Sequence, residues 1–100
     1  MIKTIKPYFS FNEQSLNVFD KLMDKDLGFQ YEGTLFESIW IYRKSQYLAI
    51  SIQVGGGGVL YVKFLFNDNS RIKESNVDMT GIDSPVKLLN KLKKDLVELN

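Results

Sequence analysis

The side chains that most often perform acid–base, nucleophilic or metal chemistry are scarce in this sequence. Its 100 residues include no histidine and no cysteine, so the commonest general base, the commonest transition-metal ligand and any thiolate nucleophile are missing. Serines are present, but there is no histidine to activate one of them. Mechanisms built on a Lys–Asp or Tyr–Glu pair are conceivable, yet no motif points to one. We therefore expect a protein that is not an enzyme and that carries no metal and no cofactor.

Asp20 and Asp24 are the carboxylates best spaced to act together, because residues four apart lie on one face of a helix. Lys21 and Lys25 alternate with them along the sequence. Two monodentate carboxylates are also too few for a calcium site. The pattern therefore predicts a solvated, charged helix face.

A run of four glycines separates two alternating apolar segments and is the most distinctive motif of the chain. The run consists of Gly55, Gly56, Gly57 and Gly58. Phosphate-binding glycine loops lead from a strand into a helix N-terminus, and the P-loop adds a lysine. These glycines lead instead into a second apolar segment, with no lysine behind them. The motif predicts a β-hairpin loop. Four glycines exceed what a tight turn needs, so the loop is also a candidate contact point that becomes ordered when a partner binds.

The segments on either side of the glycines have the two-residue period of β-strands. Tyr47–Val54 carries its apolar side chains at even positions, and so does Val59–Phe66. Opposed residues of an antiparallel pair lie on one face of the sheet, so their numbers must sum to an even total. An even total requires an odd number of loop residues. We therefore predict a loop of three or five residues, or a bulge, with the even-numbered side chains facing the core.

The odd-numbered face of this hairpin is a candidate protein interface. It carries Tyr47, Tyr61 and Lys63. The remaining odd positions are Ala49, Ser51, Gln53, Val59 and Leu65. Tyrosine is enriched at protein interfaces and in their hot spots. The alternative is that a helix of the same chain or a second copy of the chain covers this face. Stacking of single-stranded nucleic acid is a third reading, although the ribonucleoprotein motif is absent.

One stretch of the C-terminal segment concentrates positive charge. Lys87, Lys91 and Lys94 lie along one side of a predicted helix and are joined by Lys93. Asp95 and Glu98 partly neutralise this row. The row is either a solubilising face or a binding site for nucleic acid, whose affinity would then fall steeply with salt.

The apolar periodicity predicts two helices, one over 12–26 and one that begins at Ser84-Pro85. It predicts strands over 35–44, 47–54 and 59–66, and it marks weaker strand candidates at 29–32 and 72–77. Trp40 and Tyr42 share one side of the strand over 35–44, and Ile39 and Ile41 share the other, which is typical of an internal strand. Strands that follow one another indicate the α+β class. We predict a helix, a meander of three to four mainly antiparallel strands and a second helix, with both helices packed on one face of the sheet.

Length and charge limit the remaining choices. One hundred residues with 44% hydrophobic content predict a single domain over 1–100. The net charge is +1, so no overall field draws the chain to nucleic acid or to a membrane. The sequence shows neither a signal peptide nor an apolar run long enough to span a bilayer. We therefore expect a cytoplasmic protein without membrane contact.

In size and lysine-heavy composition, the chain resembles the small accessory proteins of phages and mobile elements in Gram-positive bacteria, many of which inhibit a host enzyme. That resemblance implies an inhibitor, for example of a defence nuclease, or an immunity protein. The residues point to a small non-enzymatic protein-binding module whose partner contacts are the two tyrosines, Lys63 and the glycine loop. The alternatives are a nucleic-acid-binding accessory protein that uses the lysine row, and a homodimer with a structural role.

Overall fold

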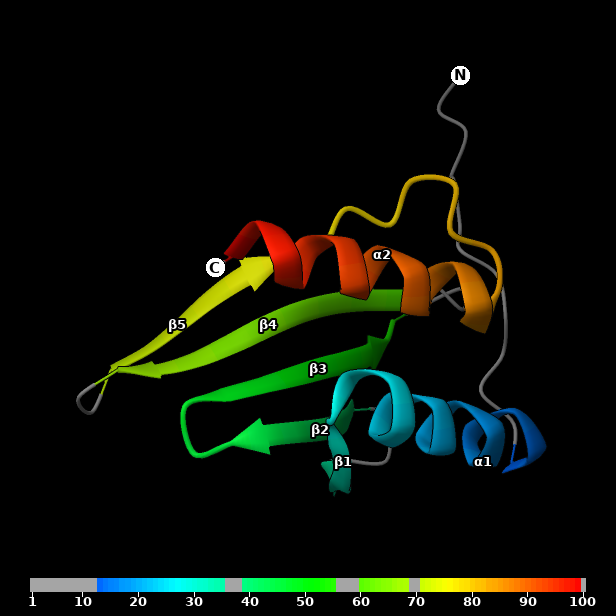
Figure 1. Cartoon of the computed structure of the whole chain (residues 1–100), viewed down its shortest axis with the longest axis horizontal. Coiled ribbons are helices and arrows are strands. Elements are labelled where there is room, and N and C mark those ends of the chain that lie inside the picture. Colours follow the sequence, from blue (N-terminus) through cyan, green and yellow to red (C-terminus); the bar gives the residue numbers. More distant parts are fainter. Residues whose placement is uncertain (1–12, 36–38, 56–59, 69–70, 100) are drawn as a thin grey trace.

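The computed structural model of the chain describes residues 13–35, 39–55, 60–68 and 71–99. Five antiparallel strands form one sheet in the order in which they occur along the chain (Figure 1). They are β1 (Gln30–Leu35), β2 (Ile39–Ser45), β3 (Leu48–Val54), β4 (Leu60–Asp68) and β5 (Arg71–Asn76). The α+β class and the antiparallel meander are confirmed. The prediction of three to four strands is wrong, because both weaker candidates pair with their neighbours and enlarge the sheet to five strands.

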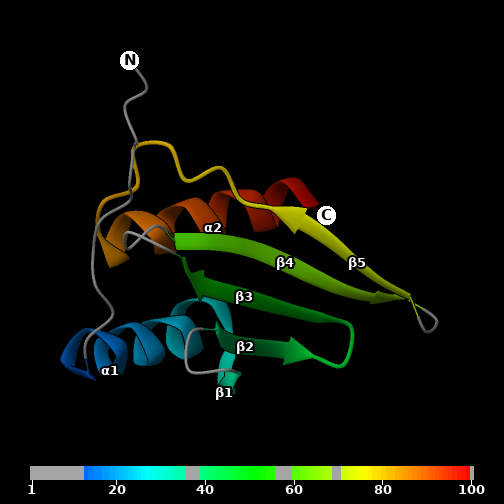
Figure 2. The same cartoon turned by 180° about the vertical axis from the view of Figure 1, so that it is seen from behind.

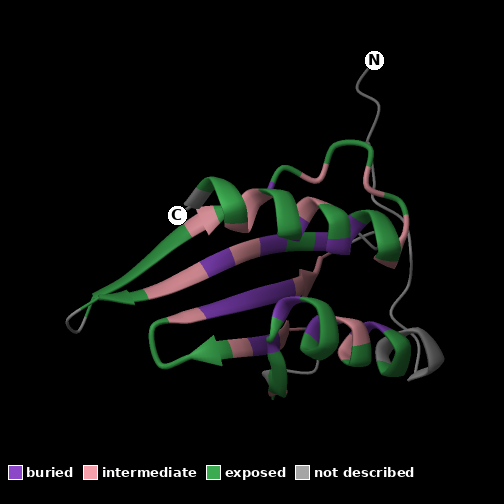
Figure 3. Ribbon diagram, viewed as in Figure 1, coloured by how far each residue is buried: buried purple, intermediate pink, exposed green. Residues whose placement is uncertain are grey.

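Helices cover one face of the sheet (Figure 1), and the view from behind in Figure 2 shows the opposite face. The even-numbered side chains of the central strands meet the helices in a single core (Figure 3). The fully or nearly fully buried core residues are Phe19, Met23, Leu27, Phe29, Tyr42, Ile50, Ile52, Leu60, Val62, Phe64, Val77, Leu88, Leu89 and Leu92. Burial of these side chains, at roughly 1.5–3 kcal/mol for each large one, is the main force that holds the two layers together.

The register of the β3–β4 hairpin agrees with the parity argument. Ile52 faces Val62 and Val54 faces Leu60, so each pair sums to an even number. Five residues, 55–59, lie between the last paired residues of the two strands. The prediction of a three- or five-residue connection with an even-numbered core face is therefore confirmed, with five residues. Gly56, Gly57 and Gly58 lie outside the described residues.

The first helix differs from its prediction at its end. α1 (Glu13–Leu22) continues directly into a π-helical turn, η1 (Met23–Leu27), instead of remaining α-helical. Gly28 then ends the helix with a left-handed φ of 74°, as its position after the apolar stripe predicts. Phe29 N donates to Met23 O at 3.0 Å across this cap. A π turn widens the helix locally, and Met23 and Leu27 both reach the core.

The second helix, α2 (Pro85–Leu99), begins where the sequence predicts. Ser84 is its N-cap, because its hydroxyl accepts a hydrogen bond from Lys87 N at 3.2 Å. Pro85 occupies the first helical position, where the missing amide hydrogen costs nothing. No helix among the described residues combines the length and the apolarity that a membrane crossing requires.

The segment predicted as one strand over 35–44 belongs to two strands. β1 ends at Leu35 and β2 begins at Ile39, with Phe36 outside the described residues. Neither glycine nor proline marks this connection, so the apolar periodicity runs across it. The assignment of faces within β2 is confirmed: Trp40 faces Ile52 on the core side, and Ile41 faces Ser51 on the other side.

Candidate functional site

The face of the sheet opposite the described helices carries Tyr61 and Lys63 of the predicted interface, and we call it the open face. Strand pairing places residues from four strands on it (Figure 2). They include Ile41, Arg43, Ala49, Ser51, Tyr61, Lys63, Leu65, Ile72 and Glu74. Among the described residues, both helices pack on the other side of the sheet. The part of the chain that the structure describes therefore leaves this face to solvent or to a partner.

The middle of the open face is recessed relative to its border. Ala49 and Ser51 are only 1% and 3% exposed, although both described helices pack on the other side of the sheet. A cavity of about 110 Å³ opens beside Ala49. Its lining consists of Arg43, Ala49, Leu65, Phe66, Asn67 and Ile72. A cavity of this size, lined in part by Ala49, Leu65 and Ile72, can accept one apolar side chain of a partner.

Charges on the open face are paired within the chain. Lys63 Nζ lies 3.0 Å from Glu74 Oε1 on the next strand. Arg43 forms a two-point ion pair with Glu32 and also donates to Ser45 O at 3.3 Å. The face is consequently close to neutral, and its binding potential comes from shape and apolar area rather than from net charge.

The structure does not bring the two predicted interface tyrosines together. Tyr61 stands on the open face, facing Gln53, and is 58% exposed. Tyr47 is not part of β3 as predicted: it lies in the turn between β2 and β3 and is 62% exposed. The length of β3 separates the two residues, a distance of roughly 20 Å at 3.3 Å per residue. They can belong to one interface only if a partner spans the whole strand.

Gly55 lies against one edge of the aromatic ring of Tyr61. A β-carbon built on Gly55 would collide with the edge of that ring. The first glycine of the run therefore lets Tyr61 lie against the hairpin end. This close approach gives one glycine of the run a structural role.

The lysine row of α2 is largely ion-paired. Lys87 lies 2.7 Å from Asp83, Lys91 lies 3.1 Å from Asp95, and Lys93 lies 3.6 Å from Asp26 of η1. Lys94 is exposed and forms no ion pair with a described residue. Nucleic-acid binding depends on cations that neutralise phosphates, so these internal pairs reduce what the row offers to a phosphate backbone.

A partly buried hydrogen bond links the first helix to the sheet. The Tyr42 hydroxyl, fully buried beneath α1, donates to Asp20 Oδ1 at 2.6 Å. Burial first, and then the hydrogen bond to the Asp20 carboxylate, raise the pKa of Tyr42 far above its ordinary value. A tyrosine with a raised pKa is a poorer acid, so the contact stabilises the fold and offers no proton for catalysis. The prediction that Asp20 belongs to a purely solvated face is therefore incomplete.

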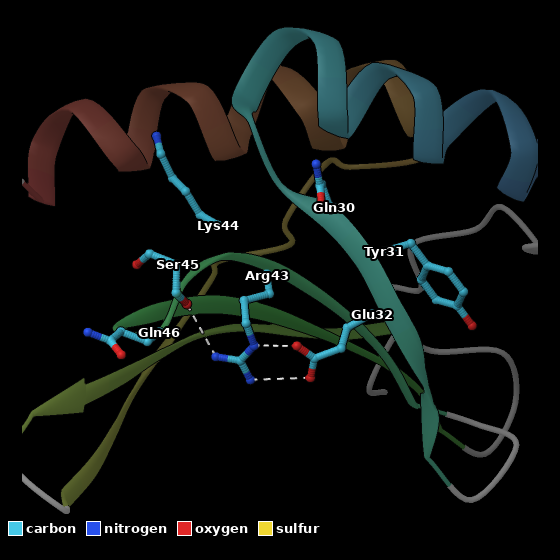
Figure 4. A pocket seen from close by; sticks show the side chains of 7 residues that line it. All are labelled: Gln30, Tyr31, Glu32, Arg43, Lys44, Ser45 and Gln46. Atoms are coloured by element: carbon cyan, nitrogen blue, oxygen red, sulfur yellow. Dashed lines mark hydrogen bonds and ion pairs between the residues drawn. The ribbon is translucent and has the colours of Figure 1, made fainter.

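A polar cavity of about 360 Å³ opens between β1 and β2 (Figure 4). Its lining consists of Gln30, Tyr31, Glu32, Arg43, Lys44, Ser45 and Gln46. The Arg43 guanidinium and the Glu32 carboxylate bind each other there (Figure 4). The third charge of the lining, Lys44, has its Nζ 5.7 Å from the centroid of the Phe29 ring. Within the described residues, no group of three or more histidine, cysteine or acidic side chains is arranged to hold a metal ion.

Comparison of the chain with protein-family models, with curated proteins and with solved structures finds no significant match. The open face is thus described by its own geometry alone. Sequence reasoning identified the contribution of β3 and β4 to this face and missed that of β5, where Ile72 and Glu74 lie. The second apolar row of the 35–44 segment did signal the contribution of Ile41.

Proposed function

We propose that this chain is a non-enzymatic protein-binding module that holds a partner protein on the open face of its sheet. The observation that carries the proposal is the combination of a shallow, nearly neutral centre with exposed aromatic and aliphatic side chains at its margin. Tyr61 is 58% exposed and faces Gln53 at one end of the β3–β4 pair, and Ile72 is 72% exposed and lines the cavity beside Ala49. Interfaces of this kind combine a dry apolar centre with a polar rim.

The partner that fits this face inserts an apolar side chain into the cavity beside Ala49. It also packs part of its surface against the ring of Tyr61. Lys63 and Glu74 form the polar rim and can exchange their mutual ion pair for contacts with the partner. An inhibitor or immunity protein is the kind of module we propose, since such proteins act by occupying a surface of another protein. Gly55, which lies against the ring of Tyr61, would extend the same contact surface.

The proposal is tested by capturing the partner from a lysate of the source organism with immobilised wild-type protein and three variants. Tyr61→Ala removes the aromatic group from the open face, and Tyr47→Ala tests whether the interface reaches the far end of β3. Val97→Ala is the control, because Val97 is 75% exposed and lies on α2, on the opposite side of the sheet. The variants must first melt at the temperature of the wild type.

We expect a stoichiometric protein that survives a high-salt wash on the wild type and on Val97→Ala. Tyr61→Ala should weaken its binding by about 1–2 kcal/mol, or about five- to thirtyfold. Equal capture by the wild type and by both tyrosine variants would contradict the proposed interface. Capture of nucleic acid alone, lost as salt is raised, would support the lysine row of α2 instead.

A further inference from the structure

β5 forms one edge of the sheet and exposes a regular row of backbone hydrogen-bonding groups. Its pairing with β4 runs from Arg71 to Asn76 without a register shift. Val77 N donates to Val62 O at 2.8 Å, which sets the alternation of inward and outward amides along the strand. Because antiparallel strands alternate in this way, the backbone groups of Ile72, Glu74 and Asn76 point away from β4. These groups are available to a further strand.

The opposite edge of the sheet is built differently. The pairing of β1 with β2 shifts register between Tyr31 and Gly33, which interrupts the row of edge groups with a bulge. Bulges at sheet edges hinder the addition of another strand. Of the two edges, β5 is therefore the one suited to strand addition.

Charge is distributed unevenly along the side of β5 that faces the helices. Arg71 and Lys73 stand at its beginning, and neither forms an ion pair within the described part of the chain. Beyond its end lies a cavity of about 400 Å³ between β5 and α2. Its lining consists of Phe64, Ser75, Asn76, Asp78, Lys91, Asp95 and Glu98. On this side the edge strand β5 is basic at its beginning, and the cavity at its end is lined by carboxylates.

Two carboxylates in this cavity remain available to a cation. Lys91 is engaged by Asp95 at 3.1 Å, so these two charges cancel. Asp78 and Glu98 are exposed. Hydrogen bonds from Thr80, one from its hydroxyl at 2.7 Å and one from its amide at 3.0 Å, hold the pKa of Asp78 below its usual value. The Asp78 carboxylate therefore stays charged at neutral pH.

We propose that β5 pairs with β5 of a second copy of this chain, antiparallel and centred on Glu74, so that the two sheets become continuous. In this register Ile72 faces Asn76 of the other copy and Glu74 faces Glu74. These are the residues whose backbone groups point outward, and each facing pair exchanges two hydrogen bonds. The antiparallel direction sets the basic beginning of each strand against the carboxylate-lined cavity at the end of the other.

The side chains favour this register over the neighbouring one. Lys73 of each copy comes to lie opposite Ser75 of the other, beside the cavity that holds Asp78 and Glu98. The two-fold axis repeats this contact. Glu74 meets its own counterpart at the axis, but Lys63 already neutralises each carboxylate at 3.0 Å. Pairing centred on Lys73 would instead oppose two unneutralised ammonium groups, which is destabilising.

The symmetry of this dimer has a consequence for binding. Antiparallel pairing within one sheet requires a two-fold axis perpendicular to the sheet, so the two open faces lie on the same side and the helices of both copies lie on the other. Five strands from each copy form one sheet of ten. The dimer would present two adjacent open faces, and a dimeric or repetitive partner could occupy both at once.

The experiment measures self-association of the purified full chain by sedimentation over a wide range of protein concentration. Lys73→Glu and Glu98→Lys each place like charges at both symmetric contacts. Mixing these two variants in equal amounts restores opposite charges at both contacts of the mixed dimer. Lys21→Glu, on the exposed side of α1, is the control with the same change of charge as Lys73→Glu. Thermal melts establish that each variant folds.

We expect a reversible wild-type dimer, an unchanged dimer for Lys21→Glu and about tenfold or greater weakening for each single edge variant. The equimolar mixture should recover most of the wild-type association. Three results would overturn the inference: a wild type that stays monomeric at every concentration, single edge variants that associate like the wild type, or a mixture no better than its components.

Discussion

The contact between Tyr42 and Asp20 makes a quantitative prediction about stability at alkaline pH. Tyr42 is fully buried, and its hydroxyl donates to the Asp20 carboxylate at 2.6 Å. Tyr42→Phe removes the hydroxyl and keeps the ring that packs edge-to-face on Phe19, with centroids 5.5 Å apart. A hydrogen bond to a charged group contributes about 1.5 kcal/mol or more, so the variant should be less stable by about that amount at pH 8.

The sign of the pH dependence follows from the raised pKa of Tyr42. In the unfolded chain a tyrosine releases its proton near pH 10, whereas the folded protein holds the Tyr42 proton well above that pH. Unfolding therefore releases a proton once the pH exceeds about 10, and the wild type loses about 1.4 kcal/mol of stability per pH unit beyond that point. The stabilisation by this group is complete below pH 10 and declines as the pH rises.

The assay is urea unfolding of the wild type and Tyr42→Phe at several values between pH 8 and pH 11. The ordinary titration of lysines affects both proteins alike, so the difference between them isolates Tyr42. From pH 9 to pH 11 the wild-type advantage should shrink by about 1.4 kcal/mol, which nearly removes it. An advantage that stays constant over this range would refute the claim that the folded state suppresses ionisation of Tyr42.

Three further substitutions test how individual residues act in the fold. Gly28→Ala places a β-carbon on a left-handed backbone with φ of 74° and should lower the free energy of unfolding by about 1 kcal/mol. An unchanged midpoint of urea unfolding would contradict the claim that Gly28 ends the helix in this conformation. Ser84→Ala removes the hydroxyl that accepts from Lys87 N and should cost about 1 kcal/mol, whereas Ser84→Asp should retain most of the stability. Gly55→Ala should displace the ring of Tyr61, visible as a change in its NMR ring-proton shifts, and unaltered shifts would show that the ring does not rest on Gly55.

Much of the fold is predictable because local rules agree with the final packing. The parity of the apolar positions sets the β3–β4 register, and the five residues left between Val54 and Leu60 are what that parity allows. The caps at Gly28 and Ser84 follow from the side-chain and backbone chemistry of single residues. These features depend on neighbours in sequence, so one sequence is enough to find them.

Other features depend on contacts between distant segments and leave no local signal. The π turn over Met23–Leu27 keeps both apolar residues on the core, a requirement that exists only once the sheet is in place. The sequence marks β5 only as a weak strand candidate over 72–77, and it forms a regular edge strand because β4 supplies its hydrogen-bonding partners. No glycine or proline lies between β1 and β2, so the apolar periodicity continues across the break and predicts a single strand.

The candidate site was predictable in part. Tyr61 and Lys63 lie on the open face as the alternation of β4 predicts. Tyr47 does not belong to β3, because the β2–β3 pairing shifts register between Arg43 and Ser45 and places Tyr47 in the turn. The ion pair between Lys63 and Glu74 joins two strands, and only the observed register brings those residues together.

The most direct test of the account is site-specific photo-crosslinking in the source organism. A photoreactive amino acid replaces Tyr61 on the open face in one variant and the exposed Val97 on α2 in another. Each crosslinked product is separated by mass and identified. If the open face holds the partner, the variant labelled at position 61 yields one discrete protein adduct and the variant labelled at position 97 does not. An adduct formed at position 97 and absent at position 61 would contradict the account and place the partner on the helical side.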